Sequence, residues 1–204
     1  MSFVRHARVR GFSLVELMVV IAIIGIGAAL AAPAISTAMA ERRASQASLD
    51  VVRLARRARS ETMAFGRAHV LRFDATGQGT LRMFRGRTPS CRTSNWDAAV
   101  GGVPLILVAG CPASSMCVDL VDMNDTRYDT GTHQVELSAP GTGNHDICYE
   151  PNGAMMYRSA GGAWLDGNAA GGIRMRVQRK VSGVVEGSDR WIVFPWGGTP
   201  RILR

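Results

Sequence analysis

Hydrophobic and polar positions divide the chain into three stretches. Residues 17–40 carry no charge for 24 residues, which is long enough to cross a bilayer core of about 30 Å. Residues 36–65 have an amphipathic period and end before Gly66, which predicts a helix that stops there. After Gly66 the period changes to two, which predicts β-strands. The apolar face of the amphipathic helix is expected to comprise Ala47, Val51, Leu54, Ala58, Thr62 and Phe65.

These patterns predict an α+β protein. A long N-terminal helix, with a membrane half and an amphipathic half, packs on an antiparallel β-sheet head domain. Residues 68–74 and 80–85 flank a Gly-rich turn and predict a hairpin. Residues 110–132 and 161–172 are expected to be irregular connections. Residues 147–150 are expected to pair with 154–158 through Pro151-Asn152-Gly153, and residues 173–179 with 190–195. The full set of further strands is expected at residues 103–109, 134–138, 147–150, 154–158, 173–179, 190–195 and 199–203.

One carboxylate, Glu16, lies near the start of the apolar run. The ten residues before Gly11 hold three arginines and no acid, which keeps that end in the cytoplasm. An ionised carboxylate in hydrocarbon costs about 2.5–3.5 kcal/mol, so it needs a partner, and no basic residue follows within the run. Cleavage between Gly11 and Phe12 would create an α-amino group, and the amine of a neighbouring copy could pair with Glu16. The alternatives are an uncleaved anchor or a signal peptide cut after Ala31, and Glu16 argues against both.

Residues 11–17, Gly-Phe-Ser-Leu-Val-Glu-Leu, with the apolar run after them, resemble the cleavage and methylation motif of type IV prepilins and type II secretion pseudopilins. The resemblance implies cleavage after Gly11 by a prepilin peptidase, N-methylation of Phe12, and Glu16 as the carboxylate that assists assembly. Pro33 falls where many pilins kink or interrupt the helix. The implied parts are a leader peptide (1–11), a transmembrane helix half (12–40) and a periplasmic head (41–204) whose amphipathic helix ends at about residue 65.

Three later segments resemble the GspH/FimT group of minor pilins and pseudopilins. The resemblance implies a minor pseudopilin, a structural component of a type II secretion pseudopilus that assembles from the bacterial inner membrane and supports protein secretion. Its implied partners are other pilin or pseudopilin subunits, the prepilin peptidase, the inner membrane and secreted proteins. The segments are LARRARSETMAFGRAHVLRF (54–73), ICYEPNGAMMYR (147–158) and WIVFPWGGTPRILR (191–204).

Charge is unevenly distributed along the chain, whose net charge is +8. Residues 42–92 hold twelve arginines against three acids, and residues 158–204 are basic again. Residues 97–150 hold eight acids against Arg127. This asymmetry indicates complementary faces between copies, an anionic partner, or simply a solvated surface.

The basic C-terminus provides an alternative function. Some FimT-like minor pilins are implicated in DNA uptake through a Gly-Arg-x-Arg motif, which Arg201 and Arg204 approximate with a different spacing. The alternative is therefore a type IV pilus minor pilin that binds DNA in uptake or pilus biogenesis. Such binding through phosphate contacts would depend strongly on salt.

Four cysteines, Cys91, Cys111, Cys117 and Cys148, lack the CxxC and His spacing of a zinc site. An even number of cysteines outside the cytoplasm indicates disulfides. Three pairings are open, and one of them joins Cys111 to Cys117 across a small loop and Cys91 to Cys148 across a large one.

No catalytic motif is recognisable, so we predict that the chain is not an enzyme and has no cofactor. The four histidines lie in unrelated contexts, and no Gly-rich phosphate loop opens a helix. An acidic region could offer oxygen ligands to Ca²⁺, but its spacing does not match an EF-hand, so no metal site is predicted. Its residues are Asp119, Asp122, Asn124, Asp125 and Asp129.

Overall fold

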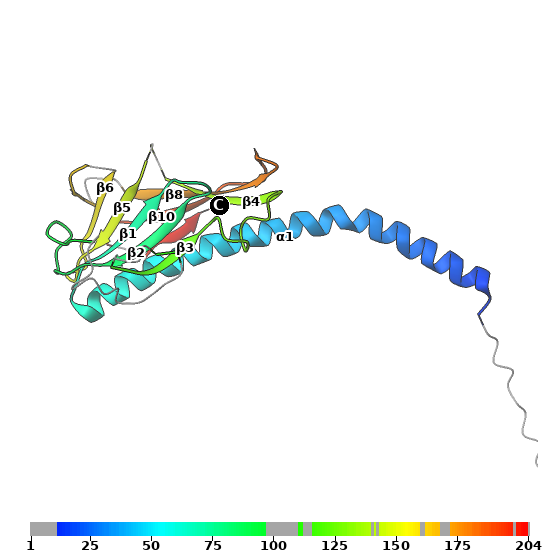
Figure 1. The fold of residues 1–204 in the computed structure, drawn as a ribbon, viewed down its shortest axis with the longest axis horizontal. Coiled ribbons are helices and arrows are strands. Elements are labelled where there is room, and N and C mark those ends of the chain that lie inside the picture. The colour runs from blue at the N-terminus through cyan, green and yellow to red at the C-terminus, as the bar shows by residue number, and fades with distance from the viewer. Residues whose placement is uncertain are drawn as a thin grey trace, which may run out of the picture. The chain divides into compact units, whose positions relative to one another are not determined.

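The structure is a computed structural model of the chain. It describes residues 12–96, 110–111, 116–139, 141, 143–159, 162–167, 172–197 and 199–203. The chain divides into two compact units, Met1–Met39 and Ala40–Arg204, and the second is called the head below. Helix α1 spans Leu14–Phe65, and all described strands lie in the head (Figure 1). The predicted α+β class, one long N-terminal helix packed with antiparallel β-sheets, is confirmed.

Within the head, α1 turns a stripe of small and branched side chains toward the sheets. The predicted positions Ala47, Val51, Leu54, Ala58 and Thr62 are all buried. The prediction that Phe65 belongs to this face is wrong, because 54% of its surface is exposed. The Arg85 guanidinium lies 4.4 Å from the centre of its ring, so the ring has a cationic partner at the surface instead of a place in the core. Gly66 ends the helix with a φ of +61°, which glycine adopts without strain.

Six strands form the first sheet, and every neighbouring pair is antiparallel. They are β1 (His69–Asp74), β2 (Thr80–Arg85), β3 (Cys117–Asp122), β5 (His145–Tyr149), β6 (Met155–Ser159) and β7 (Leu165–Asp166). Their order is β3-β2-β1-β5-β6-β7. The predicted first hairpin pairs His69 with Arg85 and Asp74 with Thr80. The predicted pairing across Pro151-Asn152-Gly153 is also confirmed, since β5 pairs with β6.

The second sheet has the order β11-β10-β8-β4, and β9 pairs with β8 outside this path. Its strands are β4 (His133–Ser138), β8 (Ile173–Val181), β9 (Val184–Val185), β10 (Arg190–Phe194) and β11 (Arg201–Leu203). The predicted pairing of residues 173–179 with 190–195 is confirmed, with Ile192 opposite Met175.

Two connections differ from expectation. Strand β3 lies within residues 110–132, which the sequence predicts to be irregular. Aspartates disfavour strands, but Val118 and Val121 of β3 are buried and its backbone pairs with β2, so tertiary contacts determine the conformation. Strand β7 likewise lies within the connection expected at residues 161–172. The strand expected at residues 103–109 lies outside the described residues.

One large core lies between α1 and the two sheets. Leu54 of α1, Leu71 of β1 and Ile192 of β10 are buried in the same cluster. A smaller cluster covers the other face of the first sheet, where Val70 and Phe84 meet Trp96. Because successive residues of a strand face opposite sides, β1 contributes Leu71 to one cluster and Val70 to the other.

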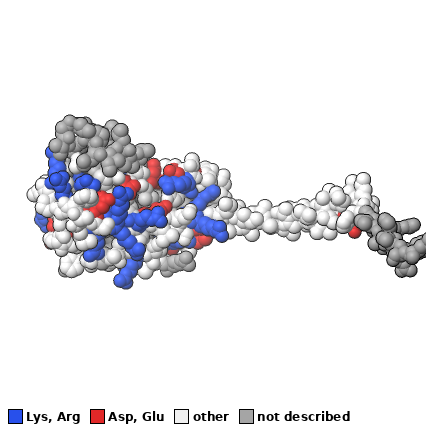
Figure 2. Space-filling view, turned by 90° about the horizontal axis from the view of Figure 1, so that it is seen from below, with Lys and Arg blue, Asp and Glu red and all other residues white. Residues whose placement is uncertain are grey.

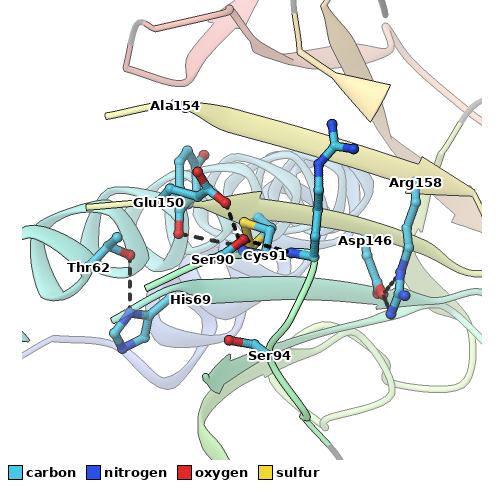
Figure 3. The surroundings of a disulfide bond; sticks show 12 residues. Thr62, His69, Ser90, Cys91, Ser94, Asp146, Glu150, Ala154 and Arg158 are labelled. Atoms are coloured by element: carbon cyan, nitrogen blue, oxygen red, sulfur yellow. Dashed lines mark hydrogen bonds and ion pairs between the residues drawn. A yellow bond between two sulfur atoms is a disulfide. The ribbon is translucent and has the colours of Figure 1, made fainter. Parts of the chain in front are cut away.

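The four cysteines form two disulfides, Cys91–Cys148 and Cys111–Cys117. Cys91–Cys148 joins the segment after β2 to β5 within the smaller cluster (Figure 3). Beside it, the Glu150 Oε1 atom accepts a hydrogen bond from the Cys91 N–H at 2.8 Å. The segment that covers the first sheet is therefore held by a covalent bond and by a hydrogen bond to a carboxylate.

Candidate functional site

The described part of the N-terminal motif starts at Phe12, and α1 begins two residues later. The Ser13 Oγ atom accepts a hydrogen bond from the Glu16 N–H at 3.2 Å, so Ser13 is the N-cap residue. Ser13 and Glu16 have the spacing of a capping box, and a carboxylate in the first turn is favoured by the helix dipole. Ser13 therefore caps α1, and the S-x-x-E spacing, which is visible in the sequence, puts Glu16 at the capping-box position.

The segment from Phe12 to Met39 buries none of its residues in the structure. All its described residues are exposed, including 83% of Phe12 and 75% of Leu30. Contiguous apolar surface on this scale is unfavourable in water and marks contact with lipid or with other proteins. By length and composition, α1 is the one described helix that could cross a membrane.

Pro33 lies inside α1, and the helix continues on both sides of it. The interruption expected at this residue is therefore not observed, whereas a kink there stays a prediction. The hydroxyl groups of Ser36 and Thr37 both donate to the Pro33 carbonyl oxygen, at 2.9 and 3.0 Å. Proline removes the N–H that would bond the Ala29 carbonyl, so these hydroxyls add donors at a different carbonyl, in the pattern that Ser and Thr commonly show three or four residues along a helix.

Gly11 lies outside the described residues, and so does the leader that precedes it. The structure therefore gives the position of Phe12 and Glu16 but not of the predicted cleavage site. Cleavage after Gly11 and methylation of Phe12 stay predictions.

A family model described as "Prokaryotic N-terminal methylation motif" matches residues 6–32. This match supports a type IV prepilin-like protein. The motif implies processing by a prepilin peptidase and assembly with pilin-type subunits, and with the apolar helix it indicates a membrane anchor. No curated protein and no solved structure matches the chain.

Many Lys and Arg side chains lie on the face of the head seen in Figure 2, and all but Lys180 of the chain's Lys and Arg residues are arginines. Arg201 is exposed on β11 and lines a groove of about 350 Å³ between this strand and α1. Arg204 lies outside the described residues, so the structure does not bring the two predicted DNA contacts together. It places Arg53 and Arg56 of α1 beside Arg201 instead, a grouping that only the fold reveals.

The acidic residues considered for calcium do not converge on one point. Among the described residues, no group of three or more His, Cys, Asp or Glu side chains could hold a metal ion. Each carboxylate has its own protein partners. Asp119 pairs with Arg57, Asp122 accepts from Thr80 and Asn124, Asp125 accepts from Arg127, and Asp129 accepts from Gly131 and Gln134.

His69 is a fully buried histidine of β1 that contacts the last turns of α1 (Figure 3). Its Nδ1 atom lies 3.1 Å from the Thr62 Oγ1 atom and 3.1 Å from the Arg67 carbonyl oxygen. Its Nε2 atom lies 3.6 Å from the Glu61 carboxylate. Burial lowers the pKa of His69, although the Arg67 carbonyl and Glu61 act in the opposite direction. The contact with Thr62 links the buried ring of His69 on β1 to α1, which is a structural role.

Proposed function

We propose that this prepilin-like protein is a minor pseudopilin of the GspH/FimT family, built into the pseudopilus of a type II secretion system. It is a structural component rather than an enzyme. The chain crosses the bacterial inner membrane once, its head lies in the periplasm, and the assembled fibre supports protein secretion. The methylation motif at the start of an exposed apolar helix carries this proposal.

The roles of individual residues follow from the chemistry of the N-terminus. Cleavage after Gly11 gives Phe12 a new α-amino group, which methylation leaves basic. Glu16 is exposed in the first turn of α1. In a membrane, where a lone carboxylate is costly, an amine from a neighbouring subunit stabilises it and specifies the register of the two helices.

A pair of substitutions separates assembly from helix capping. Glu16→Ala removes both the charge and the capping side chain, whereas Glu16→Gln removes only the charge, because Gln also serves in a capping box. We expect both variants to be cleaved by the peptidase and both to be depleted from sheared fibres, by about tenfold or more. Wild-type incorporation of Glu16→Gln would contradict the assembly role of the charge and leave only the capping role.

A second candidate function is DNA binding as a type IV pilus minor pilin, favoured by the exposed arginines around β11. Guanidinium groups that neutralise phosphates release counterions, so the affinity would fall steeply with salt. A gel-shift titration of the full chain in detergent tests this, with Arg201→Ala and Arg204→Ala as variants. Retention that neither salt nor these changes affect would remove the candidate.

A further inference from the structure

The outer face of the second sheet carries a pocket of about 550 Å³ that the proposed function does not use. Met175 of β8 and Ile192 of β10 are buried in the main core, so the residues that alternate with them point away from it. Arg176 lies opposite Trp191 on one side and opposite Ser138 on the other, so these three side chains share the outer face. They line the pocket together with Arg174 and three small residues, Ala139, Gly141 and Gly172. Its volume lies within the range of about 300–1,000 Å³ that ligand pockets commonly have.

Two arginines give this pocket a positive charge that the head neutralises only weakly. Arg174 is exposed and has no hydrogen-bond or ion-pair partner among the described residues. Arg176 meets Asp189 at 3.6 Å, and that carboxylate also accepts a hydrogen bond from Gln178 at 3.0 Å. A partly exposed ion pair of this length contributes little, so the Arg176 guanidinium can bind another anion. The chain offers no further acid at residues 139–144 or 167–172, which are all uncharged.

The spacing of the two arginines fits carboxylates on alternate residues of an extended peptide. Arg174 and Arg176 are two residues apart on one strand, which places their Cα atoms about 7 Å apart on the same face. Alternate side chains of an extended peptide have the same spacing and also share one face. Each guanidinium can bind a carboxylate through two parallel N–H···O bonds. The Trp191 ring lies against the Arg176 guanidinium, at 5.8 Å, so it serves as an apolar wall for methylene groups rather than as a free platform for a base.

The positive charge of the pocket is short along β8. Beyond Arg176 the next outward residue is the neutral Gln178, which donates to Asp189. Opposite Gln178, the Glu136 carboxylate is paired with Lys180 at 2.8 Å. The unneutralised charge therefore ends at Arg176, so this strand suits two neighbouring carboxylates better than a long run of phosphates.

We propose that this pocket, called the Arg174–Trp191 pocket below, binds an extended acidic segment of a partner protein in which carboxylates occupy alternate positions. The inference goes beyond the proposed function and does not depend on it, because every lining residue belongs to the head. Charge complementarity argues for this occupant, since two guanidinium groups without strong partners meet two carboxylates at the same spacing. The charges give specificity, while the side-chain methylene groups of the segment pack on Trp191.

The test measures the fluorescence anisotropy of labelled peptides added to the full-length protein in a non-ionic detergent. The acidic peptide contains Glu-Ser-Glu between uncharged residues, and its isomer contains Glu-Glu-Ser with the same net charge. Adjacent residues of an extended peptide point to opposite sides, so the isomer cannot present both carboxylates to one face. Arg174→Gln and Arg176→Gln remove the two positive charges. Arg56→Gln is the matched control, because Arg56 is another exposed arginine with no hydrogen-bond or ion-pair partner among the described residues.

At low salt we expect a Kd below about 1 mM for the acidic peptide and a Kd at least about fivefold higher for its isomer. Each pocket substitution should raise the Kd of the acidic peptide about threefold or more, and the double substitution about tenfold or more, whereas Arg56→Gln should change it by less than about twofold. A protein with Arg174→Glu and Arg176→Glu should instead bind a Lys-Ser-Lys peptide, which the wild type should not bind.

Several outcomes would overturn the inference. These are no saturable binding of the acidic peptide, equal affinity for the isomer, or equal effects of Arg56→Gln and Arg174→Gln. An oligothymidylate that displaces the acidic peptide, and loses affinity in Arg174→Gln, would assign the pocket to nucleic acid and overturn the inference as well. Wild-type fibre incorporation of Glu16→Gln would affect the proposed function alone, because peptide binding is measured on the purified chain.

Discussion

The two halves of α1 form one continuous helix with different surroundings. Residues 14–39 are exposed on every side and apolar almost throughout, whereas residues 40–65 bury a single stripe against the sheets and expose arginines on the other side. The first half therefore needs lipid or other helices around it, and the second needs its own head. Both halves are helical, but the first half is stabilised by lipid or other helices around it, whereas the second is stabilised by packing against its own head.

The largest expected effect on stability comes from comparing two leucines of α1 that have different surroundings. Leu54 is buried in the main core, whereas Leu30 is exposed in the first half of α1. Leu54→Ala should lower the free energy of unfolding of the head by about 2–5 kcal/mol, because it leaves a cavity among residues that cannot fully relax. Urea unfolding of the full chain in detergent, followed by near-UV circular dichroism, measures this change.

Leu30→Ala is the control and should leave the unfolding midpoint of the head unchanged. Leu49→Ala provides a second control within the head half, since Leu49 is 54% exposed. Equal destabilisation by Leu30→Ala and Leu54→Ala would break the comparison, because it would mean that both halves of the helix support the same core.

A smaller effect is expected at the start of the first half. Ser13→Ala removes the oxygen that accepts the Glu16 N–H, and loss of an N-cap costs about 0.5–2 kcal/mol. Amide hydrogen exchange in the first turn of α1 should accelerate in detergent micelles, with no change in the exchange of head amides. Unchanged exchange at Glu16 would show that Ser13 does not cap the helix.

Much of this organisation could be predicted from the sequence because its signals are local. The apolar run, the amphipathic period ending at Gly66 and the hairpin turns each lie within a short window. β3 could not be predicted, since pairing with β2 and burial of Val118 and Val121 overcome the low strand propensity of its aspartates. The groove between α1 and β11 joins residues about 145 positions apart, and only the packing of β11 against α1 brings Arg56 near Arg201.

The smallest expected effect is a pH dependence confined to the head. Burial lowers the pKa of His69. Burial also lowers the pKa of His145, although the negative charge of Asp146 acts in the opposite direction. The folded head therefore binds fewer protons than the unfolded chain. The stability contributed by the neutral rings is complete above the ordinary histidine pKa of about 6.5 and is lost as the pH falls through the lower folded-state values.

Urea midpoints measured from pH 7.5 down to pH 5 should therefore decrease, and His69→Gln should reduce the slope. The groups that face His69 are Thr62, Arg67, Glu61 and Arg85. They are the same in the wild type and in His69→Gln, so the difference in slope between the two proteins reports the titration of His69. A midpoint that rises on acidification would mean that Glu61 stabilises a protonated His69 more than burial opposes it.

The central claim is that residues 12–39 become a processed, assembly-competent stem. Mass spectrometry of the N-terminal peptide, purified from membranes of cells that contain a prepilin peptidase, tests it most directly. The account predicts a mature chain that begins at N-methylated Phe12, and an unprocessed chain in which Met1–Gly11 is retained when the peptidase is deleted. A chain that retains Gly11 in the presence of the peptidase, or one that begins after Ala31, would contradict it.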